Sequence, residues 1–204
     1  MIAVIDYGMG NLRSVSKALE SLGGDVCVTH EPMKISQCEK MVLPGVGAFG
    51  DASHELQKRN LWESVLKHIH DQKPFLGICL GLQLLLETSE ESPGARGLCV
   101  FEGQVKRFQS NKVKVPHMGW NTVDFSSAES HPLLRGVEPN SYFYFVHSFY
   151  AAVKDDAVAL GKTQYGEAEF AAILGKDNVF ATQFHPEKSQ EQGLKILKNF
   201  LEWL

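Results

Sequence analysis

A cysteine between two glycines is the first candidate for chemistry in this chain. Residues 73–87 read KPFLGICLGLQLLLE, an apolar run that predicts a buried strand ending near Cys79 and a helix beginning there. The Gly77-x-Cys79-x-Gly81 spacing is typical of a nucleophile elbow, because two residues without Cβ leave room for a sharp turn that projects the thiol outward. A helix N-terminus also favours the thiolate form. The spacing alone fits a buried structural cysteine equally well.

A histidine and a glutamate near the end of the chain supply partners for a thiol. Residues 178–189 read NVFATQFHPEKS, an apolar strand pattern that ends in His185-Pro-Glu187. Side chains two residues apart on a strand point to the same side, so the carboxylate can orient the imidazole toward a nucleophile. A surface turn with a solvated glutamate is the alternative for this tripeptide alone. Its occurrence together with the elbow favours the catalytic interpretation.

A glycine-rich loop follows the strand predicted near 40–43. Residues 41–50 read MVLPGVGAFG, and the backbone N–H groups of Val46 and Gly47, with that of Leu80, are candidate oxyanion donors. A phosphate-cradling loop is the rival interpretation, but the segment lacks the Lys-Ser/Thr of a P-loop. The glycines near the N-terminus do not complete a dinucleotide fingerprint either, since Arg13 stands where the third glycine belongs.

These motifs, in this order, resemble those of the triad (class I) glutamine amidotransferases. The segments that carry this resemblance are 44–47 (PGVG), 77–83 (GICLGLQ) and 184–187 (FHPE). Further segments are similar to the glutaminase subunits of imidazole glycerol phosphate synthase in histidine biosynthesis; these are 6–14 (DYGMGNLRS), 115–121 (VPHMGWN) and 144–149 (YFVHSF). The resemblance runs from residue 3 to the last helix. Relatives that feed anthranilate, guanylate or carbamoyl phosphate synthesis typically have a different oxyanion loop and lack the PHMGWN segment.

The resemblance implies a fold, a reaction and a set of site residues. The fold is a three-layer α/β/α arrangement around a mostly parallel, flavodoxin-like sheet. The reaction is hydrolysis of L-glutamine to glutamate and ammonia through a thioester on Cys79, with His185 as proton shuttle and Glu187 as orienting group. Contacts to glutamine are implied at Gly45, Gln83, Ser148 and Phe149. Phe149 stands where other members can carry Tyr, which leaves a hydroxyl contact there in question.

The resemblance also implies a partner. Ammonia would pass to a (β/α)₈ cyclase subunit, forming a heterodimer that makes imidazole glycerol phosphate and aminoimidazole carboxamide ribonucleotide (AICAR), with no cofactor or metal in either half. In an open α/β sheet the site lies at the carboxyl ends of the strands, so the partner is expected to dock there. The residues expected at that face are Asn11, Trp120, Tyr144 and Lys188. His117 and His147 are expected to be structural histidines that donate to backbone carbonyls.

Composition is consistent with these expectations. A chain of 204 residues predicts a single domain over 1–204, and a net charge of −4 without a Lys/Arg-rich stripe argues against nucleic-acid binding. The longest apolar run, 75–86, is too short for a membrane span of roughly 20 residues, and no signal sequence precedes the first strand. The four cysteines show no C-x-x-C spacing, so we expect neither zinc nor a disulfide, and a cytoplasmic location.

The pattern of elements predicts how the motifs are positioned. Strands near 1–6, 25–29, 40–43, 75–79 and 178–184 alternate with helical patterns, which indicates a parallel sheet wrapped by helices. The turn at 175–178 predicts a hairpin into the last strand, and Ser189-x-x-Gln192 predicts a capping box on the C-terminal helix. Two other functions stay open: a free-standing cysteine hydrolase of the same fold, such as a γ-glutamyl hydrolase, and a catalytically silent regulatory subunit.

Overall fold

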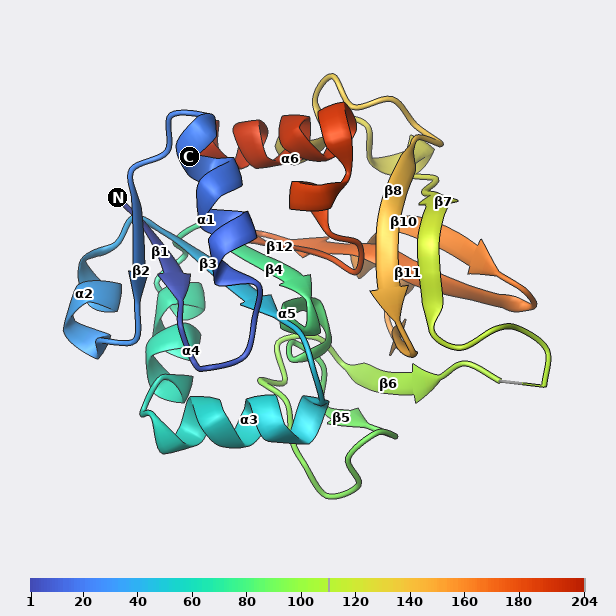
Figure 1. Ribbon diagram of the computed structural model, residues 1–204, viewed down its shortest axis with the longest axis horizontal. Helices are drawn as coiled ribbons and strands as arrows, with labels where there is room; N and C mark the ends of the chain where they lie inside the picture. Colours follow the sequence, from blue (N-terminus) through green and yellow to red (C-terminus); the bar gives the residue numbers. More distant parts are fainter. Residues whose placement is uncertain (110, 204) are drawn as a thin grey trace.

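One large mixed sheet organises the chain. The computed structural model describes residues 1–109 and 111–203, and its main sheet has the order β2-β1-β3-β4-β12-β11-β9-β6-β5, with β10 paired to β11 (Figure 1). The parallel half consists of β1 (Ile2–Ile5), β2 (Val26–Thr29), β3 (Lys40–Gly45), β4 (Phe75–Cys79) and β12 (Val179–Thr182). All five strands predicted from the sequence are therefore present and parallel to one another, while β12 also pairs antiparallel with the next strand, β11 (Ala168–Lys176).

The other half of the sheet is largely antiparallel. It consists of β5 (Thr88–Ser89), β6 (Gly103–Arg107), β9 (Phe149–Val153), β10 (Ala159–Tyr165) and β11 (Ala168–Lys176). The predicted hairpin joins β11 to β12, and Asp177 in its turn adopts a positive φ of 52°. A separate two-stranded sheet pairs β7 (His117–Thr122) with β8 (Tyr142–His147).

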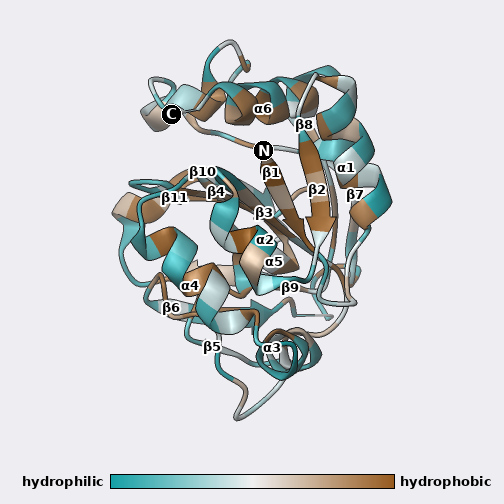
Figure 2. Ribbon diagram, turned by 90° about the vertical axis from the view of Figure 1, so that its left-hand side faces the viewer, coloured by the Kyte–Doolittle hydropathy of each residue, from teal (hydrophilic) through white to brown (hydrophobic). Residues whose placement is uncertain are grey.

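Helices cover both faces of the parallel half, as Figure 1 shows. On one face lie α1 (Leu12–Ser21) and α6 (Gln190–Glu202), and on the other lie α2 (Pro32–Gln37), α3 (Phe49–Lys58) and α4 (Trp62–His70). Strand β1 is largely brown in Figure 2 and its four residues are buried, as expected for a strand covered on both sides. The predicted three-layer α/β/α fold with a mostly parallel sheet is thus confirmed.

Ser189 differs from its predicted role as a helix cap. It precedes α6, but its side chain makes no capping hydrogen bond. Its Oγ instead donates to the His185 carbonyl at 2.6 Å and accepts from the Tyr144 N–H at 3.0 Å. Gln192 accepts from the Glu138 N–H rather than completing a capping box. The hydroxyl therefore joins β8 to the short 3₁₀ helix η4 (Pro186–Lys188), a long-range contact that the local motif could not reveal.

Across residues 1–109 and 111–203, we find no helix that combines the length and the apolar character needed to cross a membrane.

Candidate active site

Cys79 occupies a strained turn at the end of β4. Its backbone adopts φ 54° and ψ −104°, a conformation that non-glycine residues rarely take and that is common at functional sites. A Cβ at Gly81 would lie 1.9 Å from the Leu43 carbonyl oxygen, and one at Gly77 would lie 2.9 Å from the Gly81 carbonyl oxygen. The glycines are therefore required by close packing around the elbow. The helix that follows, α5 (Leu80–Gln83), is a single turn.

The glycine-rich loop lies next to the cysteine because β3 pairs with β4. In this register Gly45 is the partner of Cys79. The next residue, Val46, is 41% exposed, and Gly47 adopts a φ of 101°, a backbone conformation that favours glycine. The backbone of Val46 and Gly47 and the first residue of α5, Leu80, are thus brought to the same end of the sheet.

His185 and Glu187 form a buried ion pair beside the elbow. The strand β12 pairs with β4 and ends at Thr182, two residues before the predicted end. His185 Nδ1 lies 2.9 Å from Glu187 Oε1, and the side chains are 3% and 0% exposed. The 3₁₀ helix η4 carries Glu187, so the two side chains meet through a turn and not along a strand as predicted.

The environment of His185 favours its charged form. Burial opposes a charged imidazole, but Cys79, with its hydrogen bonding and negative charge, and then Glu187 outweigh burial and raise the pKa of His185 to about 9. Nε2 of His185 has no partner of regular hydrogen-bond geometry among the described residues, although the thiol is near enough to affect the ring. Cys79 and Glu187 therefore lie on either side of one imidazole, in the arrangement of a nucleophile, a base and an orienting group.

Two glutamine amides form a buried chain that ends at the nucleophile. Gln183 Nε2 donates to the Cys79 sulfur at 3.6 Å, and Gln183 Oε1 accepts from Gln83 Nε2 at 3.1 Å. Gln83 Nε2 also donates to the Phe149 carbonyl at 2.9 Å. The predicted substrate contact, Gln83, is thus already hydrogen-bonded and only 5% exposed. Sequence reasoning missed Gln183; a polar residue inside an otherwise apolar strand was the available signal.

The Phe149 carbonyl also accepts from His147, which is the inner member of a pair of buried histidines. His147 Nδ1 lies 2.7 Å from this oxygen, and His147 Nε2 lies 3.0 Å from His117 Nδ1. Burial lowers the pKa of His147 to about 3 and that of His117 to about 4, so both rings are neutral near pH 7. A neutral ring donates through one nitrogen only, so His117 donates to His147 and His147 to the carbonyl. The prediction of carbonyl contacts is therefore right for His147 and wrong for His117. Ser148, which lies between His147 and Phe149 in the sequence, is half-buried.

Comparisons with known proteins agree with this geometry. The family described as glutamine amidotransferase class-I matches residues 3–203. The chain belongs to this class I glutamine amidotransferase family. It is 50% identical over 204 residues to "Imidazole glycerol phosphate synthase subunit HisH" of Methanocaldococcus jannaschii, covering 100% of both chains. It is 52% identical over 202 residues to the protein of the same name from Methanothermobacter thermautotrophicus, covering 99% of this chain and 98% of that one.

Solved structures share the amidotransferase fold at lower identity. A chain in the structure of PurLQS from Thermotoga maritima aligns with a TM-score of 0.78 and 20% identity, covering 99% of this chain and 97% of that chain. A crystal structure of glutamine amidotransferase aligns with a TM-score of 0.76 and 17% identity, covering 99% and 98%. At these identities the likeness concerns the fold alone.

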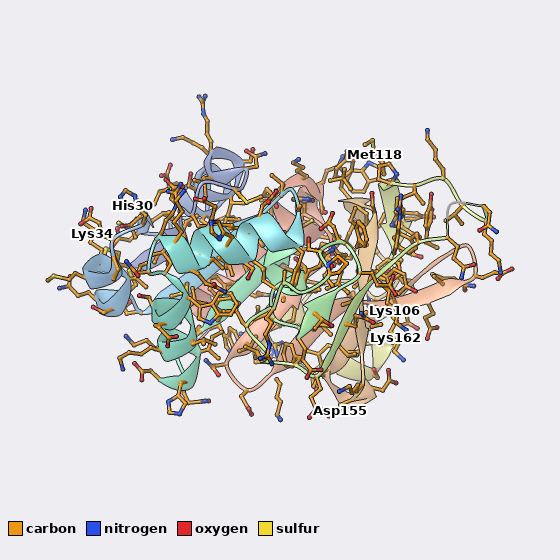
Figure 3. All side chains as sticks on the ribbon, turned by 90° about the horizontal axis from the view of Figure 1, so that it is seen from below. His30, Lys34, Lys106, Met118, Asp155 and Lys162 are labelled. Atoms are coloured by element: carbon orange, nitrogen blue, oxygen red, sulfur yellow. The ribbon has the colours of Figure 1, made fainter. Side chains whose placement is uncertain are left out.

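A cluster of exposed and half-buried side chains on β7, β8 and η4 lies beside the triad. Trp120 packs edge-on against Tyr144 with ring centroids 6.0 Å apart, and Lys188 Nζ lies 5.8 Å from the Tyr144 ring centroid. Trp120 is 45% exposed, and Met118, which Figure 3 shows at the periphery of the molecule, is 62% exposed. The His185 N–H donates to the Tyr144 carbonyl at 2.9 Å, which attaches this cluster directly to the triad histidine.

Asn11, the other residue expected at this face, lies at the start of α1. Its side chain accepts from the Ser14 N–H at 3.4 Å as the cap of that helix. The preceding loop touches the glycine-rich loop, since a Cβ at Gly10 would lie 3.5 Å from the Pro44 carbonyl oxygen and one at Gly47 2.8 Å from Met9 Cε. As for metals, no group of three or more His, Cys, Asp or Glu side chains suited to an ion occurs in the part of the chain that the structure describes.

Proposed function

We propose that this chain is the glutaminase subunit of imidazole glycerol phosphate synthase in histidine biosynthesis. It would hydrolyse L-glutamine to glutamate and ammonia and supply the ammonia to a cyclase subunit. Full-length relatives near 50% identity carry the synthase name. The observation that carries the proposal is the buried ion pair of His185 and Glu187 beside a thiol in an elbow, because a structural cysteine would need neither the strained backbone nor a charged imidazole.

Each member of the triad has one role in this reaction. The Cys79 thiolate attacks the carboxamide carbon of glutamine, and His185 transfers a proton to the leaving ammonia. Water then hydrolyses the γ-glutamyl thioester, with His185 taking a proton from the water as the thiolate leaves. Glu187 holds the imidazole in one orientation and stabilises its positive charge. The N–H of Gln183 stabilises negative charge on the sulfur before the attack.

Backbone groups would bind the rest of the substrate. We assign the oxyanion contacts to the N–H groups of Val46, Gly47 and Leu80, which flank the elbow. Gly45 and the segment of Ser148 and Phe149 would contact glutamine. Gln83 would help to bind glutamine chiefly by fixing the Phe149 carbonyl, since its amide is already hydrogen-bonded to that oxygen.

The cyclase would dock over the exposed cluster as the second half of a heterodimer. Free ammonia is protonated in bulk water, so the two sites need a covered passage between them. Large exposed side chains at this end of the molecule provide apolar area for an interface, namely Val46, Met118, Trp120 and Tyr142. Lys188 would pair with an acidic residue of the cyclase, and Asn11 and Tyr144 would complete the contact. The cyclase would convert its substrate to imidazole glycerol phosphate and AICAR. We further propose one domain over 1–204 and a cytoplasmic location, where the thiol stays reduced.

The proposal is tested by measuring glutamate release from this chain alone, with the cyclase, and with the cyclase plus its nucleotide substrate. Loss of one oxyanion donor costs about 10²–10³ in rate, so a loop aligned only by the loaded partner predicts at least about hundredfold slower release by the isolated chain. The Cys79→Ala complex is the control and should be inactive. Full activity in the isolated chain would support a free-standing hydrolase, and no activity in any mixture would indicate a silent subunit.

A further inference from the structure

Three buried polar side-chain atoms lack a hydrogen-bond partner in residues 1–109 and 111–203, and all three belong to the region of the site. Two of them, His185 Nε2 and Glu187 Oε2, are part of the triad, and the third is the hydroxyl of Tyr7. A buried hydroxyl without a hydrogen bond costs folding free energy. Its presence here therefore points to a hydrogen-bond partner that it meets in another conformation of the protein. Tyr7 is 0% exposed and has no role in the chemistry above.

The Tyr7 hydroxyl lies directly against the glycine-rich loop. A Cβ at Gly45 would lie 2.2 Å from this oxygen and 2.8 Å from Leu80 Cβ, so the hydroxyl occupies the space that a side chain at Gly45 would need. Burial and the charge of nearby Cys79 raise the pKa of Tyr7. The phenol therefore stays protonated at neutral pH and can donate one hydrogen bond.

Tyr7 and Cys79 face opposite sides of the sheet. Tyr7 packs in the core that contains residues of α2, α3 and α4, whereas Cys79 packs in the core that contains residues of α1 and α6. In a trans peptide the N–H and the C=O point in opposite directions. A Val46 N–H aimed at the Cys79 face therefore requires the Gly45 carbonyl to point toward the face of Tyr7.

We infer that the Tyr7 hydroxyl is a positioning group. It donates a hydrogen bond to its missing partner, the Gly45 carbonyl, when the Val46 N–H turns toward the Cys79 face. In the present structure the Tyr7 hydroxyl has no hydrogen-bond partner, so the glycine-rich loop is in the form that lacks the bond between Tyr7 and Gly45. Glycine at 45 allows the peptide to rotate. The hydrogen bond would then stabilise the hydrolysing form of the loop. This inference rests on the proposed glutaminase function and adds a residue to it.

The test is Tyr7→Phe in the complex with the cyclase and its nucleotide substrate, because this change removes only the hydroxyl. We expect kcat for glutamine hydrolysis to fall about fivefold to thirtyfold, the equivalent of about 1–2 kcal/mol. KM should change less than twofold, because the bond forms with the loop and not with glutamine. Alkylation of Cys79 by iodoacetamide in the isolated chain should keep its rate. The temperature of unfolding should be unchanged or higher, since an unpaired buried hydroxyl is lost.

Tyr165→Phe is the matched control. The Tyr165 hydroxyl donates to the Lys114 carbonyl at 2.7 Å, away from the elbow, so its loss should lower the temperature of unfolding and leave kcat unchanged. An unchanged kcat in Tyr7→Phe overturns the inference. A fall in the unfolding temperature of Tyr7→Phe like that of Tyr165→Phe also overturns it, because the Tyr7 hydroxyl would then already be hydrogen-bonded in the isolated chain. A slower alkylation of Cys79 in Tyr7→Phe overturns it as well. If the wild-type complex releases no glutamate, the proposed function fails together with the inference, whereas an active wild type with a fully active variant refutes the inference alone.

Discussion

Replacing Cys79 by alanine is expected to bring the pKa of His185 down from about 9 to its ordinary value of about 6.5 or lower. Burial alone lowers the pKa of an imidazole, and in this chain Cys79 is the strongest influence in the opposite direction. His147 and His117 show the effect of burial without a carboxylate or thiolate partner, since their pKa values are about 3 and about 4. Glu187→Gln should lower the pKa of His185 less than Cys79→Ala does.

The same pKa shift has a consequence for stability. The interval between 6.5 and about 9 corresponds to about 3–4 kcal/mol, at about 1.4 kcal/mol per pH unit. Because the folded-state pKa is raised, this contribution to the free energy of unfolding is fully present below about pH 6.5 and is lost as the pH rises through about 9. In Cys79→Ala this part of the pH dependence should be largely absent.

Histidine ring resonances followed by NMR across pH 5 to 10 would measure the pKa values, and denaturant unfolding over the same range would measure the stability. The resonances of His117 and His147 serve as internal controls, because neither pKa should approach 9 in any variant. A His185 pKa that stays near 9 in Cys79→Ala would refute the assignment of Cys79 as its main charged partner. A larger effect of Glu187→Gln than of Cys79→Ala would reverse the order of the two contributions.

Two further experiments test the nucleophile and the docking face, the first by chemical labelling and the second by substitution. A glutamine-like electrophile should label Cys79 in preference to the other cysteines, whereas a small general thiol reagent should also label the exposed Cys99. Mass spectrometry of the labelled peptides measures this preference. Equal labelling of all thiols by the glutamine-like reagent would contradict the assignment of Cys79 as the nucleophile. Lys188→Ala should weaken binding of the cyclase and lower the ratio of glutamine-dependent to ammonia-dependent synthesis, while Cys79 alkylation in the isolated chain is unchanged. Equal affinity and an equal ratio for this variant would remove Lys188 from the interface.

Much of the site could be predicted from the sequence because its chemistry is encoded in local spacing. The glycines on either side of Cys79 mark a sharp turn through the backbone geometry of a few residues. His185 and Glu187 are close enough in sequence to meet, although they do so through a turn and not along the predicted strand. The parallel strands could likewise be predicted from apolar runs between helical patterns. Their pairing register, which brings Gly45 beside Cys79, comes from the structure.

Only the tertiary structure decided how the remaining polar groups are partnered. Gln83 meets Phe149 and Gln183 across 66 and 100 residues of sequence, so its burial could not be read from its place on a helix. Ser189 bonds β8 and not its own helix because the fold places the Tyr144 N–H next to it. The burial of the Tyr7 hydroxyl likewise depends on long-range packing, because the ends of β3 and β4 bring Gly45 and Leu80 together beside it. Local motifs specify which groups can react, whereas long-range packing specifies which of them are satisfied, because a hydrogen bond requires two groups to meet and the sequence shows only one at a time.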